Sequence, residues 1–74
     1  MQIRLCLYGV FRHNRSAEAL RELPAGTRVA AVVESLALPN HLLGIILVNG
    51  LHAGLETVLQ EEDCLSLLPM VDGG

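Results

Sequence analysis

The two glycines that end the sequence, Gly73 and Gly74, carry the best candidate for a reacting group in this chain. They follow Pro69, where an apolar run typical of a last strand stops. Because glycine has no Cβ, a Gly-Gly segment fits through a channel too narrow for other residues. The α-carboxylate of Gly74 would then lie at the tip of a slim arm. The other interpretation is a frayed terminus, a common state of the last residues of a domain.

An α-carboxyl group has a pKa of about 3.5, so it is an unreactive anion at neutral pH. Its carbon can be attacked by a nucleophile only after a good leaving group has been attached. We predict a folded domain over residues 1–70 and a flexible tail over residues 71–74, formed by Val71, Asp72, Gly73 and Gly74. We expect the folded domain to contain no catalytic residue and the chain not to be an enzyme.

The composition argues against several classes of function. With 74 residues, 51% of them hydrophobic, the chain is long enough for one small core. Its net charge is −3 and its five basic residues are all arginine, whereas nucleic-acid binding requires a basic face. The longest apolar run, residues 42–48, is far shorter than the roughly 20 residues of a membrane-spanning helix. We expect a cytoplasmic protein that binds neither nucleic acid nor membrane.

The cysteines and histidines do not have the spacing of a metal site. A structural zinc site needs four ligands in closely spaced pairs, and here they are scattered over Cys6, His13, His41, His52 and Cys64. We therefore predict no metal and no bound cofactor. If Cys6 and Cys64 lie on neighbouring strands and the same face, they form a thiol pair. Ordinary sheet residues are the favoured interpretation, since no nearby group is evident that would lower a thiol pKa.

The first part of the chain predicts two strands. Residues 2–8 alternate between apolar and polar side chains, as in a strand with one face on a core. Residues 9–16 are polar and suit a turn or loop. Residues 17–23 favour a second strand. We expect it to pack inward through Ala19 or Leu20 and through Leu23.

One helix is predicted in the middle of the chain. An apolar stripe recurs at helical spacing over Val29, Val32, Val33 and Leu36. Thr27 is the expected N-cap, because its hydroxyl can accept a hydrogen bond from a free backbone N–H group. Pro39 disfavours a helical residue before it and should end the helix near Ala37 or Leu38.

Three further strands follow. Residues 45–48 are apolar and rich in β-branched side chains. Asn49-Gly50 then predicts a type I′ hairpin turn, with a short return strand over residues 51–53. An acidic turn over residues 60–63 precedes the last strand, residues 64–68. We therefore predict an α+β fold, a mixed sheet of four to five strands packed on one main helix. With the first and last strands parallel at its centre, this is the ubiquitin-like β-grasp arrangement.

These segments give the chain a family likeness over nearly its whole length. It resembles the small sulfur-carrier proteins, namely the small subunit of molybdopterin synthase and the thiamine-biosynthesis sulfur carrier. The likeness rests on residues 3–9, 48–50, 61–63 and above all 68–74. Tails of the form Phe-Pro-Pro-Val-Ala-Gly-Gly are typical of the molybdopterin synthase subunit. This chain departs from that form at Leu68, Met70 and Asp72, and its acidic turn lacks the glycine often found there.

The resemblance implies chemistry on Gly74. An ATP-dependent adenylating enzyme, of the ubiquitin-activating kind, would activate its carboxylate, and a sulfur donor would convert it to a thiocarboxylate. The sulfur would then pass to the large subunit of a synthase. Pro-Met-Val in the tail, and a first strand that runs on to Arg12, favour molybdopterin biosynthesis over the thiamine thiazole pathway.

Two other functions are compatible with the same sequence. In the first, the chain is a protein modifier, joined through Gly74 to a lysine of a target protein. The chain itself has no lysine, which favours the carrier. In the second, it is an interaction domain whose terminal glycines are incidental.

The partner-docking surface is predicted on the sheet face that points away from the helix. An exposed apolar patch on a small protein commonly marks a partner site. By strand alternation, this face should present Cys6, Tyr8, Ile45, Leu47 and Leu68, with Met70 at the start of the tail. The alternative is that loops around residues 39–44 cover part of it.

Overall fold

In the computed structural model, which describes residues 1–12 and 15–70, the apolar alternation at the start of the chain forms strand β1 (Gln2–Leu7). Ile3, Leu5 and Leu7 are buried on one face of the strand. The predicted second strand is confirmed as β2 (Glu18–Glu22), which pairs antiparallel with β1.

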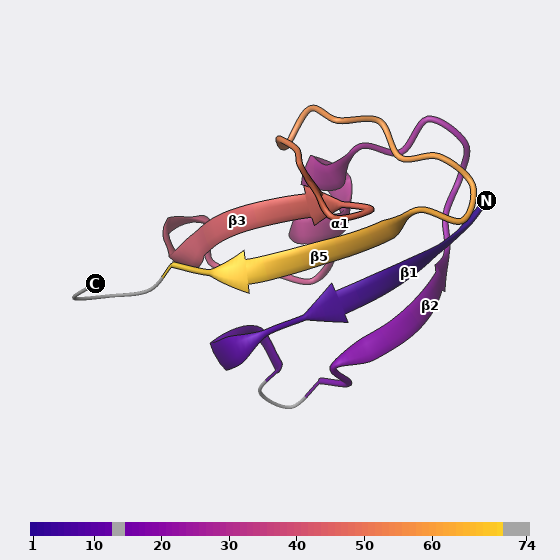
Figure 1. The fold of residues 1–74 in the computed structure, drawn as a ribbon. Helices are drawn as coiled ribbons and strands as arrows, with labels where there is room; N and C mark the ends of the chain where they lie inside the picture. The colour runs from indigo at the N-terminus through magenta and orange to yellow at the C-terminus, as the bar shows by residue number, and fades with distance from the viewer. Residues whose placement is uncertain (13–14, 71–74) are drawn as a thin grey trace.

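Strand β5 (Cys64–Pro69) lies at the centre of a mixed sheet with the order β2-β1-β5-β3-β4 over the described residues (Figure 1). It runs parallel to β1 and antiparallel to β3 (Leu43–Val48). Strand β4 (Leu51–His52) continues the sheet as the return arm of a hairpin. The predicted β-grasp order, with the first and last strands parallel and adjacent, is confirmed.

The predicted hairpin turn is confirmed, because Asn49 and Gly50 both have positive φ angles, 54° and 82°. The side chain of Asn49 also ties the hairpin to the acidic turn. Its Nδ2 donates to Oδ1 of Asp63 at 2.8 Å, and its Oδ1 accepts from the backbone of Cys64 at 2.9 Å. The carboxylate of Asp63 accepts a further bond from the backbone N–H of Gln60. Asp63 is therefore a buried residue with a structural role in starting β5.

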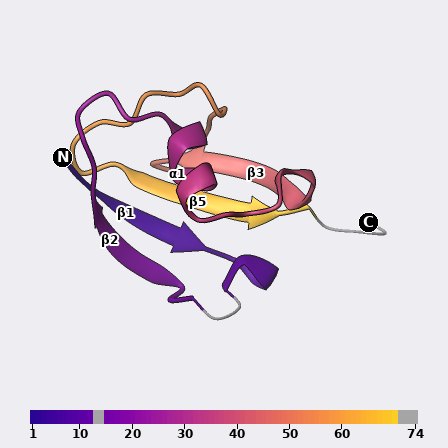
Figure 2. The same cartoon turned by 180° about the vertical axis from the view of Figure 1, so that it is seen from behind.

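Helix α1 (Val29–Ser35) covers one face of the sheet, as the view from behind shows (Figure 2). Its predicted apolar stripe is buried, but the predicted N-cap is wrong. The hydroxyl of Thr27 donates to the carbonyl of Pro24, and no side chain caps the helix. The first N–H groups of the helix are instead satisfied by carbonyls of a distant loop: Val29 donates to Thr57, and Ala30 donates to Leu55.

The helix also ends at Ser35, two or three residues earlier than predicted. Ala37 has a φ of 54°, and its N–H donates to the carbonyl of Glu34. The N–H of Leu38 reaches back to Val33 at 3.4 Å, which completes a Schellman motif. This left-handed residue, rather than the restriction imposed by Pro39, stops the helix after Ser35. A short 3₁₀ turn, η2 (Asn40–Leu42), then leads into β3.

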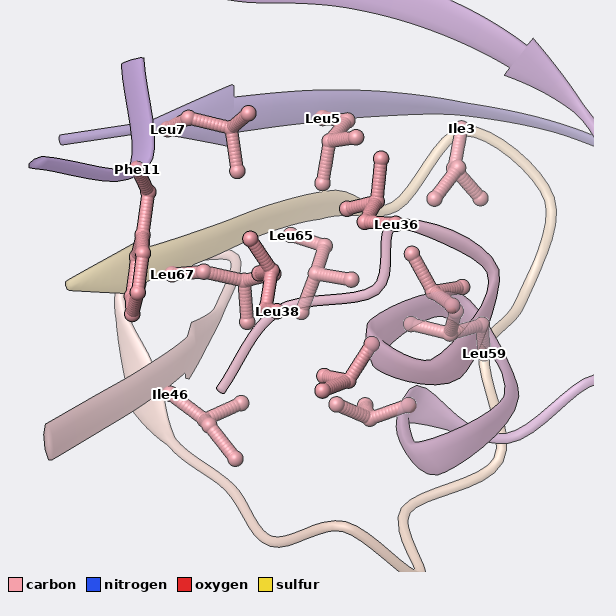
Figure 3. Packing of buried hydrophobic residues seen from close by; sticks show 13 residues of the cluster. Ile3, Leu5, Leu7, Phe11, Leu36, Leu38, Ile46, Leu59, Leu65 and Leu67 are labelled. Carbon is pink, nitrogen blue, oxygen red and sulfur yellow. The ribbon is translucent and has the colours of Figure 1, made fainter. Parts of the chain in front are cut away.

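The hydrophobic core lies between the helix and the sheet (Figure 3). Ile3, Leu5 and Leu7 from β1 point into it, as do Leu65 and Leu67 from β5. The buried set is Ile3, Leu5, Leu7, Phe11, Val29, Val32, Val33, Leu36, Leu38, Ile46, Leu59, Leu65 and Leu67.

Phe11 corrects two predictions about the segment after β1. It lies on a 3₁₀ turn, η1 (Gly9–Arg12), and is only 2% exposed, whereas residues 9–16 were expected to be a polar loop. A first strand that runs on to Arg12 is also wrong, because β1 ends at Leu7. The segment is polar overall, but its turn places the large apolar side chain of Phe11 in the core.

Within residues 1–12 and 15–70, no helix has the length and hydrophobicity needed to cross a membrane.

Candidate docking face and tail base

Strand β5 is held on both sides until the point where the predicted tail begins. The N–H of Tyr8 donates to the carbonyl of Leu67 at 3.3 Å, and the N–H of Met70 donates to that of Leu42 at 2.6 Å. The central strand is therefore fixed up to Met70, which is 61% exposed. The predicted tail residues Val71, Asp72, Gly73 and Gly74 lie outside the described residues.

Two glycines make room for this tail base, which we define as Pro69 and Met70. A Cβ on Gly44 would lie 2.9 Å from both Cα and N of Met70 and 3.0 Å from the carbonyl carbon of Pro69. The pairing of β3 and β5 shifts register at this glycine. On the other side, a Cβ on Gly9 would lie 2.7 Å from Cγ of Pro69, and Gly9 has a φ of 57°. The tail base thus passes between two backbones that approach it closely.

An apolar row crosses the outer face of the sheet beside the tail base. Ile45 is the register partner of Leu68. Tyr8 comes directly after Leu7, the register partner of Leu67, so it stands next to Leu68 on the other side. Tyr8 is 46% exposed, Ile45 is 41% exposed and Leu68 is half-buried. We call Tyr8, Leu68 and Ile45 the outer row.

The other predicted docking residues lie on the same face. Cys6 and Leu47 are both register partners of Ser66, so they form a second, half-buried line across β1, β5 and β3. Leu20 was missed as an outer residue: it pairs with Arg4 and is 60% exposed. Its place on the outer face follows from the register of β2 on β1, which the weak alternation of residues 17–23 did not reveal.

The outer face becomes polar toward the β2 edge. Arg4 and Glu18 form an exposed ion pair with 3.4 Å between Nη1 and Oε1, an arrangement that adds little stability. Beside them, the sulfur atoms of Cys6 and Cys64 are 3.8 Å apart. The predicted placement of the two cysteines on neighbouring strands and one face is correct. Burial raises the pKa of Cys6, the hydrogen bond with Cys64 and nearby Glu18 act the same way, and Arg4 opposes them.

A comparison with protein-family models matches residues 7–74 to the ThiS family. The chain belongs to the ThiS family. Comparison with the sequences of curated proteins found no match. The ThiS match includes both the tail base and the two terminal glycines, and the sequence-based recognition of a small ubiquitin-like sulfur-carrier family is confirmed.

Solved structures share the fold of this ThiS-family chain. The HVO 2177 protein of Haloferax volcanii has a TM-score of 0.81 and 24% identity, over 100% of this chain and 87% of that one. SAMP1 from Haloferax volcanii has a TM-score of 0.78 and 20% identity over the whole of both chains. A chain in the complex of subunits 1 and 2 of the molybdopterin-converting factor from Helicobacter pylori 26695 has a TM-score of 0.68 and 22% identity, again over both whole chains.

Together, the family match and the fold establish the general nature of the chain. It has the ubiquitin-like β-grasp fold and belongs to a family of small sulfur-carrier proteins that are generally non-catalytic.

The close approach at Gly44 gives a first prediction. In Gly44→Ala the new Cβ meets backbone atoms of Met70 and Pro69, which cannot rotate away as a side chain can. We expect the tail base to be displaced and the free energy of unfolding to fall by about 1–3 kcal/mol, the usual cost of overpacking. Denaturant unfolding followed by circular dichroism measures this change.

Gly54→Ala is the matched control. A Cβ at Gly54 meets nothing within 4 Å, and its φ lies outside the left-handed region. Its unfolding free energy should stay within about 0.5 kcal/mol of the parent value. Equal effects of the two substitutions would show that the contact at Gly44 does not constrain the tail base.

Proposed function

We propose that this chain is a sulfur carrier that bears sulfur as a thiocarboxylate on Gly74. The observation that carries the proposal is the tail base, where a backbone hydrogen bond to Leu42 holds the chain at Met70 and Gly9 and Gly44 leave room for its passage. The four residues after Met70 span at most about 14 Å in extended form. A partner that binds the outer row can therefore receive the terminal carboxylate in a nearby active site, which the folded domain is too wide to enter.

The proposed chemistry has two steps, both performed by partner enzymes. In the first, the Gly74 carboxylate oxygen attacks the α-phosphorus of ATP, which releases pyrophosphate and leaves an acyl-adenylate. In the second, hydrosulfide from a sulfur donor attacks the acyl carbon, AMP leaves with the bridging oxygen, and the thiol proton goes to solvent, which leaves the thiocarboxylate. The carrier then delivers this sulfur to the large subunit of a synthase. ATP belongs to the activating enzyme and is not a cofactor of this chain.

Molybdopterin biosynthesis is the pathway that we propose for the sulfur. The fold likeness to a subunit of the Helicobacter pylori molybdopterin-converting factor, which is solved in complex with its second subunit, supports this choice. The Pro-Met-Val sequence at residues 69–71 supports it as well. The length of the first strand does not support it, since β1 ends at Leu7. The thiamine thiazole pathway is the alternative destination.

A modifier function is the second candidate, and the fold likeness to SAMP1 favours it. A further structure from H. volcanii, with a TM-score of 0.76 and 19% identity, is described as small archaeal modifier protein 1. A modifier would use the same adenylated carboxylate but would transfer the acyl carbon of Gly74 to a lysine amine. Because this sequence contains no lysine, it cannot be extended into a polymer through its own side chains.

We propose that the outer row docks the adenylating enzyme, with Cys6, Leu47 and Met70 at its border. In Leu68→Asp a carboxylate replaces the middle of the row, and burying that charge at an interface is costly. We expect the KM of adenylation for this protein to rise about tenfold or more, measured as ATP–pyrophosphate exchange with the activating enzyme of the same host. Leu47→Asp should act in the same direction.

Leu51→Asp is the control for this substitution, since Leu51 is 73% exposed on β4 and is not in the outer row. Its KM should match that of the parent protein, and circular dichroism should show all three variants folded. If Leu68→Asp is folded and its KM is unchanged, the outer row is not the docking surface.

Deletion of Gly74 tests the reacting group itself. The shortened chain ends at Gly73, so its carboxylate stops one residue, about 3.5 Å, short of the activating site. We expect ATP–pyrophosphate exchange to be abolished, while thermal unfolding stays unchanged because the described sheet and core are formed by residues up to Pro69. An unchanged exchange rate would exclude Gly74 as the adenylated residue.

A further inference from the structure

Two thiols meet on the outer face at a separation that neither the fold nor the proposed carrier chemistry requires. The sulfur atoms of Cys6 on β1 and Cys64 on β5 are 3.8 Å apart, and both residues are free and half-buried. They lie diagonally across the central parallel pair, because the register partner of Cys64 is Arg4 and that of Cys6 is Ser66.

We propose that Cys6 and Cys64 form a two-thiolate binding site for a soft metal ion with a filled d shell, such as Zn²⁺ or Cd²⁺. A zinc–thiolate bond is about 2.3 Å long, so two thiolates at the tetrahedral angle lie about 3.8 Å apart. The observed sulfur separation is 3.8 Å. The site therefore has the required spacing without any movement of the strands, and thiolates are the ligands that soft ions prefer.

A disulfide between the same residues fits the geometry less well. It requires an S–S bond of about 2.05 Å and Cα atoms within about 6.8 Å of each other. Two residues of offset add about 6.6 Å along the strands to a spacing of about 4.8 Å between them, which places the Cα atoms about 8 Å apart. The central pair of strands would have to shift to close the bond, whereas a metal ion spans the gap as it stands.

The outer face has a hollow beside one of the two cysteines. Cys64 lines an open hollow of the outer face together with Arg4, Leu20 and Glu62. Among the residues that the structure describes, no group of three cysteine, histidine or acidic side chains is gathered around a metal position. Water or a donor atom from another molecule would complete the coordination. An ion bound here lies on the same face of the sheet as the outer row.

Metal binding at this site must release protons. Each thiol gives its proton to the solvent and becomes a thiolate ligand, so one ion displaces up to two protons. Because the two ligands must lose their protons, the affinity for the ion should increase as the pH rises.

The test is a titration of the reduced, full-length protein with Cd²⁺. We expect an ultraviolet thiolate-to-cadmium charge-transfer band that saturates at one ion per chain, with proton release detected by calorimetry in two buffers. Cys6→Ser and Cys64→Ser should each weaken binding about tenfold or more, since each removes one of two protein ligands. His52→Ala should bind as the parent does, because His52 lies across β3 from the thiols.

Three results would overturn the proposal: no charge-transfer band in the parent protein, binding by either serine variant as tight as that of the parent, or one ion shared between two chains. Loss of binding in His52→Ala would also contradict it, by placing the ion elsewhere. Circular dichroism checks that the variants are folded. If a serine variant does not fold, Cys6→Ala and Cys64→Ala provide a second pair of variants for the same measurement. The proton count in the parent protein does not depend on any variant.

Discussion

The position of β5 between β1 and β3 is the constraint on which the rest of the structure depends. A last strand at the edge of a sheet would be hydrogen-bonded on one side only, and its end would be free to fray. Here β5 pairs with neighbours on both sides, and its own side chains Leu65 and Leu67 are fully buried in the core. The backbone is consequently fixed up to Met70, and the tail starts from a defined point on the surface. This arrangement requires glycine at positions 9 and 44, because a side chain at either position would collide with the tail base.

The sheet places the side chains that stabilise the domain and the side chains proposed for docking on opposite faces. The side chains that hold the domain together face the helix, and those available for docking face the opposite way along the same strands. Leu67 is fully buried while its neighbour Leu68 takes part in the outer row. A substitution on the outer face can therefore change partner binding with little effect on the core, which makes the two contributions separable by experiment. The thiol pair shares the outer face, so a bound ion and a docked partner would lie on the same side of the sheet.

Periodicity and turn residues predicted the elements of this fold, and the order of those elements predicted the β-grasp arrangement. The alternation of residues 2–8, the apolar stripe of α1 and the Asn49-Gly50 turn are local signals, and each was confirmed. The predicted N-cap was wrong because a tertiary contact replaced the local capping rule. Carbonyls of Leu55 and Thr57 satisfy the start of α1 in place of the Thr27 side chain.

The candidate site was predictable only in part, for the same reason. Strand alternation was sufficient to place Tyr8, Ile45 and Leu68 on the outer face. The docking role of these residues stays a prediction, as does the role of Gly74. Leu20 was missed because its side depends on the register of β2, and Gly44 because a close approach between distant backbones leaves no local pattern. Phe11 was missed because a polar segment carries it into the core.

The most direct test of the account is the intact mass of the chain purified from its host with its activating enzyme and sulfur donor present. A thiocarboxylate on Gly74 adds about 16 Da to the mass of the sequence, because sulfur replaces one oxygen, and the increase should map to the C-terminal peptide. Deletion of Gly74 should remove the increase. A mass that equals that of the unmodified sequence, under conditions in which the activating enzyme is active, would contradict the sulfur-carrier function. Covalent adducts with lysines of other proteins would instead identify a modifier.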